Sequence, residues 1–369
     1  MPWEVFEELL RAALKPLADI KLHPESFYQG LRLVAIDGTE FSVANTPQVL
    51  GQLTKATSRR FQAAFAKIGI CVLVEVGQHN PIAAAIGDKG NCELALAKNL
   101  WDQLPKCCLL LADRAYGTAW TIGQLLERLK AQKGHCLIRV RSNLKMKFLK
   151  ALSDGSALVE MGVRDREKPR QTRQTLLLRE IRGLVRKPGM AQAAEVRLWT
   201  TLLDEKSHPA RVLLELYIKR WEQELYYHQL KIDVRSCDML QSHTVHTAAQ
   251  ELAALVLASA LLARQRLQCA DQAQVETLRI SFAKVLESTR ALWYVLEIGQ
   301  EIVTPQQACK LVKANMDDMV QSCLLTPRRK RSCPRAVRQP VQKWPRLIQN
   351  QSHNGPAIYE ISPVTTSIS

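Results

Sequence analysis

Two aspartates follow directly after apolar runs in this sequence. Asp37 follows the run LVAI, and Asp113 follows the run LLLA. Apolar runs of this kind predict buried strands, and carboxylates at strand ends converge at one edge of an α/β sheet, where ligands commonly bind. A single aspartate at such a place is usually a helix cap or a turn residue, so it is the repetition that indicates a site.

A third carboxylate lies in the segment YIKRWEQELYYHQLK, residues 217–231. At about 100° per residue, four side chains of this segment fall within roughly 60° of one another on a helix. These side chains are Tyr217, Arg220, Glu224 and Lys231. Taken alone, the stripe also fits a solvated helix face with an i,i+4 ion pair between Arg220 and Glu224.

Together, these residue types favour metal-dependent phosphoryl transfer. Three carboxylates can hold two Mg²⁺ ions about 3.5–4 Å apart, which stabilise the attacking and leaving oxygens. Arginine and lysine beside the third carboxylate can hold phosphate groups of a bound strand. A tyrosine adds a hydroxyl donor and a stacking face.

The elements that must position these residues are those of an α/β core. We expect a helix in residues 1–28, strands at 31–36, 70–76, 82–86 and 107–112 with 41–43 continuing a hairpin, and helices at 92–104 and 118–133. Further strands at 135–141, 157–161, 175–182 and 195–203 predict a β-rich insertion. Residues 210–231, 246–268, 274–300 and 305–324 then predict helices.

Composition is typical of a folded protein that binds a polyanion. The chain has 369 residues, 47% of them hydrophobic, with 51 Lys and Arg against 35 Asp and Glu and a net charge of +16. Residues 128–150 and 164–187 are basic, and residues 319–359 contain no acid and form a basic tail. Such charge favours nucleic-acid binding through counterion release, although a solvated surface gives the same composition.

Neither a membrane span nor a secretory leader is expected. The longest apolar run, Leu252–Ala263, is twelve residues, whereas a span needs roughly 18–20. Glu4, Glu7 and Glu8 occupy the place of a basic leader region. The ten cysteines are scattered without a CxxC motif, which favours free thiols in a reducing compartment. We therefore expect a cytoplasmic, nucleoid-associated protein.

The sequence resembles the transposases of the IS-four family of insertion sequences. The matching segments are GLRLVAIDGTEF (30–41), LLLADRAYG (109–117) and YIKRWEQELYYHQLK (217–231). The last contains the family signature of tyrosine, two residues, arginine, three residues, glutamate, six residues and lysine. The resemblance implies a DDE-type DNA transposase, an Mg²⁺-dependent polynucleotidyl transferase and endonuclease on a ribonuclease-H-like fold.

This resemblance implies a role for each matched residue. Asp37, Asp113 and Glu224 are expected to form the catalytic and metal-binding triad, which holds two Mg²⁺ ions or Mn²⁺ in their place. Tyr217, Arg220 and Lys231 are expected to contact DNA near the transposon end. In relatives that cleave through a hairpin, a displaced base stacks on tryptophan. Trp199 and Trp221 are candidates for this role, and Trp199 fits the core of the insertion equally well.

The resemblance also sets the expected organisation. The segments are a short N-terminal helical segment (1–30), the first part of the ribonuclease-H-like core (31–133), the β-rich insertion (134–208), the second part of the core with the third carboxylate (209–268), a C-terminal helical region (269–325) and a basic, disordered tail (326–369). We expect double-stranded DNA as partner, both transposon ends and target, and a homodimer that pairs two ends.

The expected function is cut-and-paste transposition of an insertion sequence by strand cleavage and 3′-OH strand transfer. Only 36 residues precede Asp37, whereas family members usually carry a larger N-terminal helical region that recognises the terminal repeats. Two alternatives therefore stay open at this point. One is a truncated or domesticated DNA-binding protein, and the other is a ribonuclease-H-like nuclease without strand transfer.

Overall fold

The computed structural model describes residues 3–55, 57, 62–87, 92–141, 144–164, 172–186, 192–235, 237–326, 336–337, 346–347 and 359–365. The chain forms two compact units, each built from separate stretches of sequence. The first unit comprises Met1–Leu111, Arg128–Gly134 and Arg220–Leu325. The second unit comprises Ala112–Glu127, His135–Lys219 and Thr326–Ser369.

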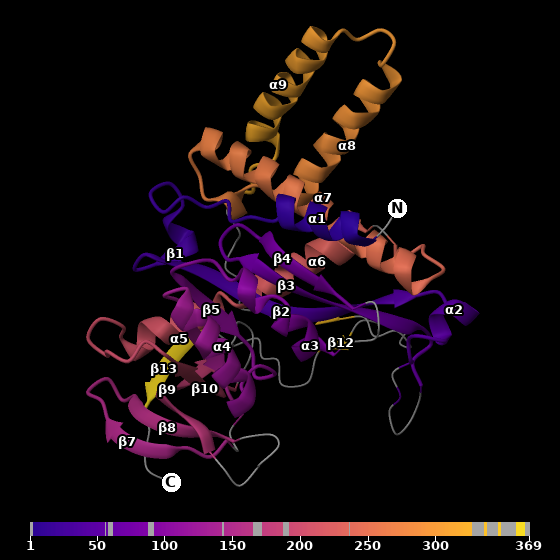
Figure 1. Cartoon of the computed structure of the whole chain (residues 1–369). Helices are drawn as coiled ribbons and strands as arrows, with labels where there is room; N and C mark the ends of the chain where they lie inside the picture. Colours follow the sequence, from indigo (N-terminus) through magenta and orange to yellow (C-terminus); the bar gives the residue numbers. More distant parts are fainter. Residues whose placement is uncertain are drawn as a thin grey trace. The chain divides into compact units, whose positions relative to one another are not determined.

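The first unit is a sheet covered by helices on both faces (Figure 1). Its sheet has the order β4-β3-β2-β5, with the short β1 also paired to β2. Its strands are β1 (Phe27–Tyr28), β2 (Leu31–Val43), β3 (Ala66–Glu75), β4 (Asn80–Ile86) and β5 (Cys108–Ala112). Its helices are α1 (Trp3–Ala13), η1 (Pro24–Ser26), α2 (Pro47–Leu50), α3 (Glu93–Lys98), η2 (Trp101–Gln103), α6 (Trp221–His228), the π-helical η3 (Gln229–Val234), α7 (Val245–Ala273), η4 (Thr277–Arg279), α8 (Phe282–Ile298) and α9 (Pro305–Ser322).

Strand β2 positions Asp37 through its long antiparallel pairing with β3. The pairing runs from Val34 opposite Glu75 to Val43 opposite Ala66. Because side chains alternate along a strand, Asp37 shares a face with Thr39, Phe41 and Val43. Phe41 and Val43 belong to the main hydrophobic core together with residues of α6 and α7, so Asp37 lies on the helix-covered face that carries α6.

Helix α7 is the central core helix of the first unit. Thr244 caps its start by accepting a hydrogen bond from the Thr247 amide, and Leu252 and Val256 are fully buried. By length and composition alone this helix is apolar enough to cross a membrane, with half of its most apolar stretch buried. The core helix of a soluble protein passes the same test, and α7 contacts both β3 and β4.

The second unit is a β-rich body whose sheet has the order β6-β10-β9-β8-β7, with β13 also paired to β9. Its elements are most of α4 (Ala119–Ala131), then β6 (His135–Arg139), β7 (Lys147–Ala151), β8 (Ala157–Arg164), β9 (Thr172–Arg186), β10 (Ala194–Thr200), α5 (Ala210–Ile218), β11 (Ala336–Val337), β12 (Arg346–Leu347) and β13 (Glu360–Val364). The mixed sheet, the β-rich segment and the C-terminal helices confirm the predicted fold class.

Several predicted elements differ from the observed ones in the N-terminal half. The helix predicted over 1–28 ends at Ala13, shortly before Pro16. Beyond it, the Leu17 and Ala18 amides donate to the buried Glu75 carboxylate, and the short elements η1 and β1 follow. The predicted break after Ile36 is wrong, because β3 pairs with β2 across Asp37 and Gly38 without interruption. The helix predicted over 92–104 is divided into α3 and η2.

The C-terminal half also departs from prediction. The helix expected over 210–231 is not uniform: i→i+3 hydrogen bonds join Lys219 to Leu216 and Gln223 to Arg220. Helix α8 starts at Phe282 rather than at 274. Strands β7 and β13 were not expected. The predicted disordered tail contains β13, which pairs with β9, whereas its basic residues from Arg328 to Lys343 lie outside the described residues. The predicted division of the chain into six segments stays a prediction.

A buried arginine connects the second unit's sheet to the start of α5. The Arg179 side chain is fully buried. It pairs with Asp154, donates to the Ser156 hydroxyl at 2.8 Å and donates to the His208 carbonyl at 2.7 Å. Asp154 in turn accepts a hydrogen bond from the Ala210 amide at 2.7 Å. One guanidinium therefore satisfies groups from three parts of the unit.

We predict that Arg179→Ala lowers the free energy of unfolding by about 3–5 kcal/mol, because it removes one partner of a buried ion pair. Urea unfolding followed by circular dichroism measures this change. Arg211→Ala is the matched control: Arg211 forms an exposed i,i+4 pair with Glu215, which is worth about 0.3–0.5 kcal/mol. Equal losses in the two variants would contradict the role given to Arg179.

Candidate active site

Two of the three predicted carboxylates meet at one guanidinium in the first unit. Arg220 Nη2 donates to Glu224 Oε1 at 2.6 Å, and Arg220 Nη1 lies 3.6 Å from Asp37 Oδ2. Asp37 comes from the middle of β2, Arg220 from the start of α6 and Glu224 from the next turn of α6. The arginine side chain is 15% exposed and the Glu224 side chain 36%, so this carboxylate pair is reachable from solvent.

Helix α6 is fixed on β2 and β3 by hydrogen bonds to the backbone of these strands. The buried Gln223 donates to the Val72 carbonyl of β3 at 3.2 Å. Tyr227 donates its hydroxyl to the Asp37 carbonyl at 2.6 Å, and burial raises the pKa of Tyr227 well above its ordinary value. Since Gln223 and Tyr227 flank Glu224, they fix the turn of helix that carries this carboxylate.

The other face of β2 also contributes a carboxylate. The Gly38 amide donates to two carboxylates: its nitrogen lies 2.9 Å from Asp37 Oδ1 and 3.1 Å from Glu93 Oε1. A Cβ atom at position 38 would lie 2.4 Å from Glu93 Cγ. Glycine is therefore required here by a close approach of α3, and Glu93 supports the strand beside Asp37.

Lys231, the signature lysine, also lies against β2. It belongs to the π-helical segment η3 and donates to Thr39 Oγ1 at 2.6 Å, two residues from Asp37 on the same face. Burial, followed by the charges of Arg235 and Lys67, lowers the pKa of Lys231. The first unit thus brings Asp37 of β2 together with Arg220, Glu224 and Lys231 of the signature, although the three signature residues do not lie on one continuous α-helix.

The remaining predicted residues of the triad and of the DNA contacts divide between the units. Trp221 belongs to the first unit and is 41% exposed. Asp113, which accepts a hydrogen bond from the Ala115 amide, and Tyr217 on α5, which is buried, belong to the second unit. That Asp113 and Tyr217 form one site with Asp37 and Glu224 stays a prediction.

Trp199 lies in the interior of the second unit. It is 1% exposed, and its indole Nε1 donates to Glu180 Oε2 at 2.7 Å. The same carboxylate accepts a hydrogen bond from Arg197 Nε at 2.6 Å. This burial favours the alternative that Trp199 is a core residue, because no face of the ring is open to a nucleobase in the described structure.

The donor set of the first unit suits a hard divalent cation. Asp37 and Glu224 converge on a positive charge, the Arg220 guanidinium, and carboxylate oxygens are the ligands that Mg²⁺ prefers in proteins. Among the described residues, no three His, Cys, Asp or Glu side chains gather as a metal site. A metal held by these two carboxylates would therefore need a further ligand.

Sequence reasoning missed several residues that contact this site. Thr39 and Tyr227 hold Lys231 and Asp37, and both follow from simple periodicity: Thr39 lies two residues after Asp37 on a strand, and Tyr227 lies three after Glu224 on a helix. Glu93 has no local signal, because α3 reaches β2 through tertiary packing.

Comparisons with known proteins find similarity to transposases. The family described as transposase DDE domain matches residues 28–261. The transposase InsG for insertion sequence element IS4 of Escherichia coli strain K12 is 25% identical over 332 residues, which cover 87% of this chain and 71% of that protein. A solved piggyBac transposase synaptic complex with hairpin DNA is similar at a TM-score of 0.45 and 10% identity. The match covers 78% of this chain, which spans 57% of the piggyBac chain.

We predict that Gly38→Ala destabilises the first unit by about 1–3 kcal/mol, because the new methyl group overpacks against Glu93. In a Glu93→Ala background the same substitution should cost less, giving a coupling free energy of about 0.5–3 kcal/mol in a double-mutant cycle of urea unfolding. Gly51→Ala is the matched control, since its Cβ would have ordinary contacts, the nearest at 3.4 Å. Additive losses would show that Glu93 is not held against Gly38.

Proposed function

This chain belongs to the transposase DDE domain family, and we propose that it cleaves DNA at the ends of an insertion sequence and transfers the freed 3′-OH to target DNA. The family is one of polynucleotidyl transferases and endonucleases that use a divalent metal. The observation that carries the proposal is the convergence of Asp37 and Glu224 on Arg220, because these residues come from distant parts of the sequence and match the signature.

We propose Asp37, Asp113 and Glu224 as the catalytic carboxylates. They would hold two Mg²⁺ ions, or Mn²⁺ in their place. When bound, these ions activate the nucleophile and stabilise the charge that develops at the phosphate. The contacts of Asp37 and Glu224 with the same arginine, Arg220, support the assignment of these two carboxylates. Asp113 would supply the further ligand, and the segment from Asp113 to Gly117 supports it by matching the family.

Arg220 has two competing roles in this proposal. In the described structure its guanidinium neutralises two carboxylates. A guanidinium also binds phosphate through parallel hydrogen bonds. With Asp37 and Glu224 as ligands of a metal, the Arg220 guanidinium would bind a DNA phosphate in their place. Tyr217 and Lys231 would contact DNA as well, and the exposure of Trp221 supports it, rather than Trp199, as the surface for a displaced base.

The deciding experiment is cleavage of DNA that carries the element ends, in Mg²⁺, by wild type and by Asp37→Asn, Asp113→Asn and Glu224→Gln. Each variant should lose about a thousandfold or more in cleavage rate, since metal-held charge stabilisation is worth several kcal/mol. Glu215→Gln is the matched control, because Glu215 lies exposed on α5 and pairs with Arg211. It should cleave as wild type does.

The products of this reaction separate the alternatives. Joining of a 3′ end to target DNA supports a transposase, whereas nicks without joined products would indicate a nuclease. Binding of end DNA without any cleavage by wild type would indicate a domesticated DNA-binding protein. Undiminished cleavage by Asp113→Asn would remove Asp113 from the triad.

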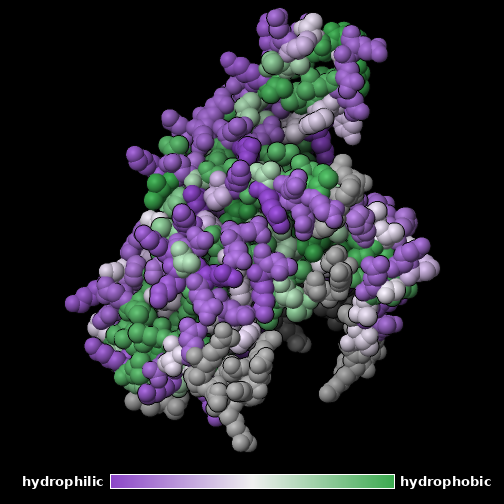
Figure 2. Space-filling model, in the orientation of Figure 1, coloured by the Kyte–Doolittle hydropathy of each residue, from purple (hydrophilic) through white to green (hydrophobic). Residues whose placement is uncertain are grey.

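We also propose that the α8–α9 hairpin pairs two copies of the chain, as transposition of two ends requires. The two helices pack side by side and extend away from α7 (Figure 1). Large apolar side chains lie exposed along them, with Trp293 at 70% and Ile298 at 82% exposure. Figure 2 shows this gathering of hydrophobic residues. Exposed aromatic patches of this kind mark protein interfaces, and a two-fold contact would cover both copies equally.

We predict that the double variant Trp293→Glu, Ile298→Glu halves the mass of the complex with end DNA, because charges at the centre of an apolar interface are left unpaired. Sedimentation velocity measures the mass. Leu261→Glu is the control, since Leu261 is an exposed apolar residue of α7 outside the hairpin. An unchanged mass in the double variant would show that this surface does not pair copies.

A dimer acting on chromosomal DNA would work in the cytoplasm, at the nucleoid.

A further inference from the structure

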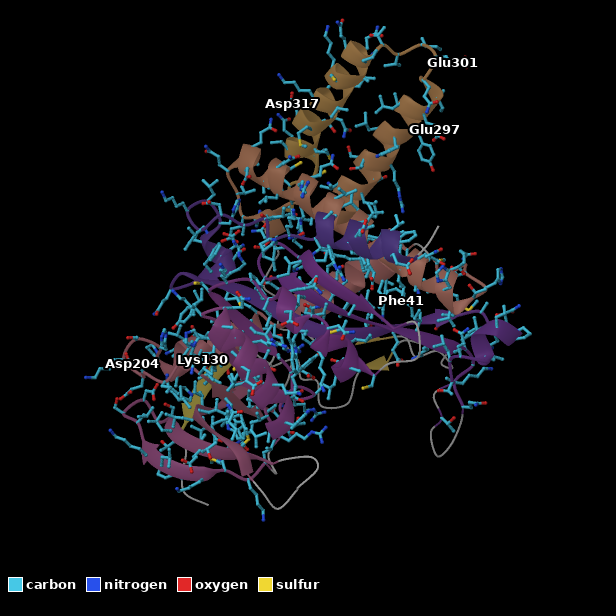
Figure 3. The ribbon with its side chains drawn as sticks, viewed as in Figure 1. Phe41, Lys130, Asp204, Glu297, Glu301 and Asp317 are labelled. Atoms are coloured by element: carbon cyan, nitrogen blue, oxygen red, sulfur yellow. The ribbon has the colours of Figure 1, made fainter. Side chains whose placement is uncertain are left out.

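Two cations lie over one buried ring on the site-bearing face of β2. Lys231 Nζ lies 5.2 Å from the centroid of the Phe41 ring, and Arg235 Cζ lies 5.3 Å from the same centroid. Phe41, labelled in Figure 3, is 1% exposed. The ring therefore serves as a fixed floor for two positive groups, since a cation over an aromatic face is attracted to it.

The π-helical geometry of η3 keeps these two cations together. The Arg235 amide donates to the Leu230 carbonyl, an i→i+5 hydrogen bond, and π-helical turns are frequent at functional sites. Like charges four residues apart repel one another. The charge of Arg235 lowers the pKa of Lys231, after the larger effect of burial.

Among the described residues, neither Lys231 nor Arg235 forms an ion pair, although the charge of Glu40 acts on Lys231 and opposes the lowering of its pKa. The neighbouring acid, Glu40, pairs instead with Lys67 at 3.1 Å. A further cation, Arg290 of α8, donates to the Val234 carbonyl at 3.3 Å. The region around Phe41 thus has excess positive charge, which is the electrostatic requirement for an anion site.

Arg235 also has a donor without an acceptor. Its Nε is buried and has no hydrogen-bond partner among the described residues. Unsatisfied buried donors are rare and costly in native proteins. A guanidinium suits a phosphate group because its parallel N–H groups match two phosphate oxygens, and a phosphate at this place would supply the missing acceptor as the side chain turns toward it.

We propose that Lys231 and Arg235 form a two-cation clamp over Phe41 that holds one phosphate of the DNA backbone, with Arg235 as a DNA contact outside the family signature. The proposal rests on the proposed function, because the phosphate is taken to belong to DNA. The clamp lies on the same face of β2 as Asp37, so the strand it holds passes beside the catalytic carboxylates.

The test is fluorescence anisotropy of a fluorescein-labelled DNA duplex, titrated with Arg235→Gln, Arg235→Lys and wild type at several NaCl concentrations. Loss of one phosphate contact should reduce the slope of log K against log salt by about one in Arg235→Gln. Arg235→Lys should keep the wild-type slope, because its charge is retained, but bind less tightly than wild type because the fork is lost. Arg264→Gln is the matched control, because Arg264 is an exposed arginine of α7. It should match wild type in both the salt slope and the affinity.

A thermal melt without DNA separates binding from folding. Arg235→Gln should melt close to the wild-type temperature, since the lost attraction to the Phe41 ring is offset by relief of the repulsion and of the unsatisfied donor. A wild-type salt slope in folded Arg235→Gln would overturn the clamp, while wild-type binding and cleavage would leave the proposed function intact. Absence of DNA binding by wild type would overturn both.

Discussion

The ten-residue antiparallel pairing of β2 with β3 is the constraint on which the rest of the first unit depends. It keeps a polar stretch, Asp37 to Glu40, in extended conformation inside a sheet. The alternation of a strand then divides the neighbours of that stretch. Asp37, Thr39 and Phe41 meet α6 and η3, while Gly38 meets α3 through Glu93. Disturbing the register by one residue would exchange these partners.

The helical segment that packs on β2, α6 followed by η3, departs from regular α-helical hydrogen bonding. Between residues 216 and 235 the hydrogen bonding passes from i→i+3 at Lys219 and Gln223 to i→i+5 at Arg235. A uniform α-helix would direct Arg220, Glu224 and Lys231 along one straight stripe. The observed segment instead wraps its side chains along β2, so that Arg220 reaches Asp37 and Lys231 reaches Thr39.

Local sequence signals predicted most of the buried strands and the long helices, because apolar runs and 3–4 spacing report burial directly. They predicted Arg220, Glu224 and Lys231 as neighbours through the signature spacing, and Asp37 as a site residue from its place after an apolar run. They failed where tertiary contacts decide. Asp37-Gly38 has the composition of a turn, yet β3 holds it in a strand. Glu93 and Arg235 have no local signal, because α3 and Phe41 approach them from other parts of the chain.

The strand β13 has a consequence for how the protein is made. It completes the sheet of the second unit by pairing Glu360–Val364 with Arg182–Arg186 of β9. The first unit likewise needs residues 220–325 to cover its sheet. Neither body is finished when the ribosome has synthesised its opening strands. Since such distant pairings form slowly, Arg182–Arg186 of β9 lack their β13 partner until synthesis passes residue 364, and an unpaired strand edge of this kind can pair with another chain.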